Sequence, residues 1–82
     1  MKNQLLQSTV FTYTDYLSGN KKVTHYPAIT GIDKKSIPSQ FNVPGAIFRF
    51  DAYGFGQMNL PPEETREKAK IKADEFLSNY LS

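Results

Sequence analysis

The 82-residue chain contains no cysteine and no tryptophan, and His25 is its single histidine. The missing thiols exclude disulfides, thiol catalysis, iron–sulfur clusters and cysteine-based zinc sites. A lone histidine cannot complete a metal site by itself. A chain of this length buries only a little over ~60% of its unfolded surface. Good packing or oligomerisation must therefore stabilise it, and the 13% aromatic content favours packing.

Long apolar runs are also missing. No stretch approaches the ~20 apolar residues of a membrane span. Residues 1–11 contain one lysine and no apolar run of ~7–15 residues, unlike a secretory signal. With 39% hydrophobic and 22% charged residues the composition is that of an ordinary globular protein. We therefore expect a soluble cytoplasmic protein with no membrane partner.

Recognisable catalytic motifs are absent as well. The chain has no Gly-x-Ser-x-Gly elbow and no phosphate-binding glycine loop. Outside the C-terminal segment its only carboxylates are Asp15, Asp33 and Asp51. Asp15 and Asp51 could form a catalytic pair, and His25 could act as a base. For each of these residues the catalytic role is the weaker alternative to a structural one. Catalysis needs several convergent groups in a dry pocket. The prediction is no enzyme, no metal and no cofactor.

The chain does contain a clear hairpin pattern. Residues 9–17 and 22–29 are rich in β-branched and aromatic side chains and flank a turn signal at Gly19-Asn20. A two-residue loop there places Tyr16 opposite Val23. Because Pro27 cannot donate a ladder hydrogen bond, it indicates an edge strand or a shortened one.

A second strand and a helix follow. Residues 46–53 alternate strongly and predict a strand, preceded by a type II turn at residues 43–45. Residues 37–42 are either a short extra strand or a packed loop anchored by Ile37 and Phe41. Residues 61–82 predict a helix that starts at Pro61-Pro62, with Glu63 and Glu64 in its first turn. Its apolar stripe is Ala69, Ala73, Phe76, Leu77, Tyr80 and Leu81.

These elements predict one α+β domain over residues 1–82, an antiparallel meander of three or four strands in residues 1–60 with the helix packed on one face. One helix covers only one face of such a sheet. If that face carries Phe48 and Phe50, the open face holds Ile47, Arg49 and Tyr53. One side of the hairpin must join it, either Phe11, Tyr13 and Tyr26 or Val10, Tyr16, Val23 and Ile29.

Tyrosine and arginine on an exposed sheet are typical of recognition surfaces. We therefore expect a small non-catalytic adaptor, inhibitor or assembly protein that binds another protein or a second copy of itself. The expected contact residues are Tyr13, Tyr26, Arg49, Tyr53 and Phe55, with the edge near Pro27 as a further contact. The opposing interpretation is that residues 31–45 and the N-terminal residues fold over this face and bury it. Phages and mobile elements often encode small proteins of this kind.

Single-stranded nucleic-acid binding by the same aromatics is the alternative function. Phosphate contacts, or contacts to an acidic partner, would come from two lysine pairs, Lys21, Lys22, Lys34 and Lys35. Residues 52–58 resemble the aromatic strand of RNA-recognition domains, and residues 66–73 resemble the last helix of double-stranded-RNA-binding domains. The first resemblance does not extend to the neighbouring elements. In the second, the helix begins with Pro-Pro-Glu-Glu where that family has a basic cluster. Neither resemblance therefore assigns a family.

Ile71 is the one apolar residue on the expected solvent side of the helix, about 200° around the helix axis from Ala69. Singly exposed apolar residues are common on protein surfaces. The alternative is a small self-association contact at this position.

Overall fold

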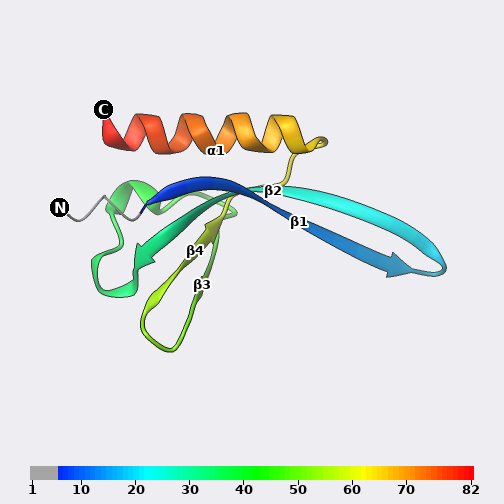
Figure 1. Ribbon diagram of the computed structural model, residues 1–82, viewed down its shortest axis with the longest axis horizontal. Helices are drawn as coiled ribbons and strands as arrows, with labels where there is room; N and C mark the ends of the chain where they lie inside the picture. The colour runs from blue at the N-terminus through cyan, green and yellow to red at the C-terminus, as the bar shows by residue number, and fades with distance from the viewer. Residues whose placement is uncertain (1–5) are drawn as a thin grey trace.

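In the computed structural model, which describes residues 6–82, two β-hairpins join side by side into one antiparallel sheet (Figure 1). The first hairpin is β1 (Gln7–Leu17) and β2 (Asn20–Asp33), and the second is β3 (Ile47–Phe50) and β4 (Phe55–Asn59). The strand order is β1-β2-β4-β3. The predicted α+β class, an antiparallel sheet with a C-terminal helix on one face, is confirmed. The order departs from a strictly sequential meander because β4, not β3, pairs with β2.

The first hairpin turns at Ser18-Gly19, one residue earlier than predicted. Both residues have positive φ, 53° and 76°, as a type I′ turn requires. Tyr16 therefore pairs with Lys21 and not with Val23. This register differs from the predicted one by two residues. A shift of two keeps every side chain on its predicted face, whereas a shift of one would have exchanged the faces.

Pro27 lies inside a central strand, so the expectation that it marks an edge or ends the strand is wrong. The strand tolerates it because its nitrogen points away from β1. On that outer side the Pro27 carbonyl accepts a hydrogen bond from the Leu60 N–H (2.8 Å), and the His25 carbonyl accepts one from the Glu63 N–H (2.8 Å). The stretch from Leu60 to Glu63 thus covers the edge of β2 beyond the end of β4.

The second hairpin replaces the single long strand expected over residues 46–53. β3 ends at Phe50, and the Asp51 carboxylate accepts hydrogen bonds from the backbone N–H groups of Tyr53 (2.8 Å) and Phe55 (3.1 Å). An aspartate that bonds its own following backbone stabilises a turn. The chain therefore reverses at residues 51–54 and returns as β4, a strand absent from the sequence prediction.

Between the hairpins, residues 34–46 form a packed loop and no extra strand. Phe41 is fully buried, with ring centroids 5.3 Å from Phe76 and 5.0 Å from Tyr80. Ile37 is 39% exposed, so Phe41 is the anchor of the loop. The predicted type II turn is present, because the Ala46 N–H donates to the Val43 carbonyl (3.0 Å) and the intervening Gly45 has φ +84°.

The helix α1 (Arg66–Leu81) begins later than predicted. Pro61-Pro62 and the following glutamates do not form its first turn, because the Glu63 backbone is bonded to β2. Thr65 is the N-cap, and its hydroxyl accepts a hydrogen bond from the Lys68 N–H (3.1 Å). No helix within residues 6–82 is both long and apolar enough to cross a membrane.

The core lies between α1, the packed loop and the sheet face that carries Phe48 and Phe50. Its buried members are Ile29, Ile32, Phe41, Met58, Leu60 and Ala73. Of the predicted helix stripe, Ala69 and Ala73 are fully buried and Phe76, Leu77 and Tyr80 pack against the core, while Leu81 is exposed. The helix contacts β1 and β2, and the opposite sheet face has no helix on it.

Candidate functional site

The sheet face opposite α1, called the open face below, collects side chains from all four strands. The strand pairings place Phe11 beside Tyr26, Ala28 beside Asn59 and Ile47, and Thr30 beside Gln57 and Arg49. Since side chains alternate along a strand, the open face comprises Thr9, Phe11, Tyr13, Tyr26, Ala28, Thr30, Ile47, Arg49, Phe55, Gln57 and Asn59. The hairpin side with Phe11, Tyr13 and Tyr26 is therefore the one that shares a face with Ile47 and Arg49 of β3.

Large apolar side chains on the open face are accessible to solvent. Ile47 is 57% exposed, Tyr13 50%, Phe55 42% and Phe11 37%. Phe11 and Tyr26 contact each other across the hairpin, with ring centroids 6.3 Å apart. The loop of residues 34–46 packs on the opposite side through Phe41, so it does not cover these rings. The other segment expected to cover them, residues 1–5, lies outside the described residues.

A shallow hollow of about 400 Å³ opens on this face between the two hairpins. Phe11 and Phe55 form apolar walls. The polar side chains at the hollow are Arg49, Asp51, Gln57 and Asn59. The Gln57 amide donates to the Asn59 side-chain oxygen (2.7 Å), which fixes two side chains at its base. The hollow thus offers apolar contact together with oriented amide groups.

Arg49 supplies the positive charge at the hollow. Within residues 6–82 its guanidinium forms no salt bridge. The nearest carboxylate at the hollow, Asp51, is already held by the backbone N–H groups of its own turn. Guanidinium groups bind carboxylates through paired, charge-assisted hydrogen bonds. Arg49 is therefore able to receive an acidic group from outside the chain.

Four of the five predicted contact residues lie on the open face, namely Tyr13, Tyr26, Arg49 and Phe55. Arg49 and Phe55 line the hollow, whereas Tyr13 pairs with Thr24 on the part of β2 that extends beyond β4. The prediction that Tyr53 lies on a strand beside them is wrong, because the strand ends at Phe50. Tyr53 stands in the turn of the second hairpin and is 87% exposed. It lies next to the hollow in sequence but outside its lining.

The two lysine pairs lie at opposite ends of β2. Lys21 and Lys22 follow the turn of the first hairpin, and Lys34 and Lys35 follow the other end of the strand. Lys22 and Lys34 are twelve positions apart in the sequence, which corresponds to ~40 Å of extended chain. Lys34 lies 6.0 Å from the Phe50 ring centroid. The lysines therefore do not form one basic stripe beside the aromatics.

The remaining candidate residues are dispersed. Ile71 is 55% exposed on α1, as predicted for the solvent side. The His25 ring nitrogen Nδ1 lies 3.2 Å from the Thr12 hydroxyl. Asp15 is the cross-strand neighbour of Lys22 near the turn of the first hairpin, whereas Asp51 lies in the turn of the second hairpin. The two carboxylates therefore do not form a catalytic pair. Among residues 6–82 no three His, Cys, Asp or Glu side chains gather as a metal site.

Sequence reasoning missed the contribution of β4 to the site. The strand predicted over residues 46–53 is followed by Gly54 and Gly56, which weaken a strand pattern, so the prediction places Gln57 and Asn59 on no strand. The signal that could have found them is the alternation of Phe55, Gln57 and Asn59 directly after an Asp-Ala-Tyr-Gly turn sequence.

Comparison with protein families, with curated proteins and with solved structures finds no match to this chain.

Proposed function

We propose that the chain is a small, non-catalytic, cytoplasmic protein-binding module that docks a partner protein on its open face. The observation that carries the proposal is the composition of this face. The solvent side of a helix-backed antiparallel sheet is ordinarily polar. Here it presents Phe11, Tyr13, Ile47 and Phe55, each at least 37% exposed, together with Arg49, which forms no salt bridge within residues 6–82.

The chemistry of the hollow favours a particular kind of partner segment. Apolar walls accept an aliphatic or aromatic side chain, and desolvated aromatic and arginine residues dominate binding energies at interfaces. Arg49 adds a preference for a carboxylate next to that side chain. The partner is thus expected to present an apolar residue flanked by Asp or Glu. The open face holds several aromatics, but the two lysine pairs lie at opposite ends of β2 and form no basic stripe beside them. This separation favours a protein partner over a nucleic acid.

The test is affinity capture of a partner from the native host, followed by measurement of its Kd for variants of the chain. The double variant Arg49→Ala, Phe55→Ser removes the guanidinium and one wall of the hollow. Loss of two central contacts is expected to raise Kd at least about tenfold. Because Phe55 is 42% exposed, the fold survives, which an unfolding curve verifies.

Ile71→Ala is the matched control, since it removes an exposed apolar side chain from the outer side of α1. It leaves Kd unchanged if the open face is the binding surface. Equal binding by the double variant and the wild type would refute the proposal. Retention of a single-stranded oligonucleotide that falls steeply with added salt, and is lost in the double variant, would reassign the face to nucleic acid.

A further inference from the structure

The two edges of the sheet differ in how they are protected. β3 is a four-residue edge strand that carries Arg49. β1 is an edge strand of eleven residues, pairs only with β2, and contains no proline or lysine and a single charge at Asp15. Natural proteins usually block long edges with such residues, because unpaired backbone groups recruit other strands. The β1 edge lacks this protection.

The hairpin turn determines which backbone groups this edge presents. Leu17 and Asn20 flank the two-residue turn and form a hydrogen-bonded pair. Because such pairs alternate along an antiparallel ladder, the even-numbered residues Ser8, Val10, Thr12, Thr14 and Tyr16 direct their N–H and C=O groups away from β2. On β2 the same alternation holds, since the outward carbonyls of His25 and Pro27 accept hydrogen bonds from the 60–63 segment.

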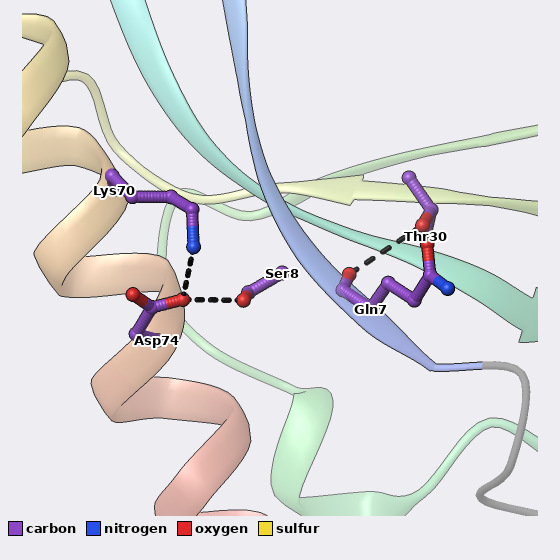
Figure 2. A network of polar contacts seen from close by, with 5 residues as sticks. All are labelled: Gln7, Ser8, Thr30, Lys70 and Asp74. Atoms are coloured by element: carbon purple, nitrogen blue, oxygen red, sulfur yellow. Dashed lines mark hydrogen bonds and ion pairs between the residues drawn. The ribbon is translucent and has the colours of Figure 1, made fainter.

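A hollow lies beside one end of this edge. It has a volume of about 440 Å³ and is lined by Ser8, Asp74 and four residues at the end of the chain, Leu77, Ser78, Leu81 and Ser82. Figure 2 shows the Ser8 side chain pointing to Asp74 of α1, while Gln7 next to it lies beside Thr30 of β2. Ser8 thus marks the point where the β1 edge and this apolar hollow meet.

An exposed aromatic stands at the other end of the same edge. The first hairpin extends as a two-stranded arm away from α1 and the second hairpin (Figure 1). Near its tip Tyr16 is 71% exposed. Tyr16 and Ser8 lie on the same side of β1, because both are even-numbered. One molecule therefore carries both a protruding aromatic ring and a hollow that no other part of residues 6–82 fills, at opposite ends of one strand.

We propose that a second copy of the chain pairs with β1, antiparallel, with Thr12 opposite Thr12 of the partner subunit. This register overlaps all eleven residues of the strand. It places Phe11 opposite the partner's Tyr13, an aromatic cross-strand pair that occurs twice. It also places Tyr16 opposite the partner's Ser8, at the hollow against α1. Asp15 faces Thr9 of the partner subunit, so no like charges oppose each other.

A second copy fits better than an unrelated strand because the match depends on self-pairing. Antiparallel alignment of β1 with itself brings the tip of one arm to the base of the other, where the hollow lies. The contact is then isologous and closes as a two-fold dimer. The axis lies perpendicular to the sheet and leaves both open faces on the same side. The pairing does not depend on what the open face binds.

The first experiment measures the solution mass of the full chain by sedimentation equilibrium over a range of concentrations. The wild type is expected to show a monomer–dimer equilibrium. Thr12→Pro removes an outward N–H, which an edge strand tolerates, and is expected to raise the dimer Kd at least about tenfold. Thr12→Ala is the matched control, because it also loses the contact with His25 but keeps the N–H. It remains dimeric.

A second variant covers the case in which Thr12→Pro does not fold. Since the chain has no cysteine, Thr12→Cys introduces a single thiol, which the proposed register brings close to its symmetry mate. Mild oxidation is expected to cross-link this variant at least about tenfold faster than Ile71→Cys, a thiol on the outer side of α1. Tyr16→Ala weakens the dimer by losing the hollow contact.

A wild type that stays monomeric at every concentration overturns the proposal. So does a folded Thr12→Pro variant that remains dimeric, or a Thr12→Cys variant that cross-links no faster than Ile71→Cys. The double variant Arg49→Ala, Phe55→Ser is expected to stay dimeric, because neither residue lies on the β1 edge. Its loss of partner binding therefore reports on the open face alone.

Discussion

At the scale of the residue, Gly56 shows how closely the second hairpin is packed. It pairs with Phe50 of β3 on one side and with Ile32 of β2 on the other. A Cβ atom at this position would lie 1.9 Å from the Arg49 carbonyl oxygen and 2.7 Å from Cδ1 of Phe50. The Arg49 oxygen belongs to the backbone, so it cannot move away from the added Cβ atom as the end of a flexible side chain can. Glycine is therefore required by space here.

Gly56→Ala is expected to lower the free energy of unfolding by at least about 2 kcal/mol, because overpacking displaces β3 from β4. Urea unfolding followed by circular dichroism measures the loss. Gly19→Asn is the control, since Gly19 has nothing within 4 Å of its virtual Cβ and asparagine tolerates its φ of +76°. Equal stabilities for wild type and Gly56→Ala would show that β3 and β4 are not packed as described.

The side chains of the open face were largely predictable one residue at a time. Alternation places Tyr13 and Tyr26 on one face of the hairpin, and the two-residue error in register left that assignment intact. Arg49 followed from the alternation of β3. Tyr53 could not be placed, because the turn that removes it from the sheet depends on Asp51 bonding two later N–H groups. Such bonding competes with strand geometry and leaves only a weak trace in the sequence.

At the scale of the element, the Asp74 carboxylate joins α1 to β1. The Asp74 carboxylate accepts hydrogen bonds from Lys70 (2.6 Å) and from the Ser8 hydroxyl (Figure 2). The Lys70 hydrogen bond, followed by that of Ser8, holds the pKa of Asp74 below its usual 3.8. The negative form of Asp74 thus joins the helix to the start of the edge strand.

A lowered folded-state pKa makes stability depend on pH in one direction. The stabilisation from Asp74 is fully present above the unfolded pKa of 3.8 and is lost as the pH falls through the lower folded value. The difference in unfolding free energy between wild type and Asp74→Asn should therefore shrink as the pH drops below 3.8. Because the side chains of Lys70 and Asp74 are about half exposed, the effect is small and decreases with salt.

Urea unfolding at a series of pH values measures this difference. Glu75→Gln is a suitable control, because it removes a carboxylate from the same helix without removing a salt bridge within residues 6–82. If the difference in unfolding free energy between wild type and Asp74→Asn stays constant down to the lowest pH, the Ser8–Asp74–Lys70 contact contributes nothing in solution.

The elements differed in how well their sequence identified them. The first hairpin and the helix have strong periodic patterns, and both were predicted in type. The start of α1 was misplaced because Pro61 and Glu63 suit a first helical turn equally well. Backbone bonds from this segment to β2 decide against it, and such long-range contacts do not appear in local sequence. β4 was missed for a related reason, since its close packing against β3 requires Gly56, and that glycine weakens the strand pattern in the sequence.

At the scale of the whole molecule, the shape follows from unequal strand lengths. β1 and β2 continue well past the four-residue and five-residue strands of the second hairpin, so the molecule extends to 46 × 29 × 20 Å. On one side of the sheet, the helix covers the part of β1 and β2 that lies alongside the second hairpin (Figure 1). This arrangement leaves the open face and the long β1 edge without a partner among residues 6–82.

Docking on the open face is most directly tested by nuclear magnetic resonance of the labelled chain during titration with its captured partner. Binding on this face is expected to shift the signals of Phe11, Tyr13, Tyr26, Arg49 and Phe55 together, while those around Ile71 on the outer side of α1 stay unchanged. Shifts confined to α1 or to the lysine-bearing turns, with the open face unchanged, would contradict it.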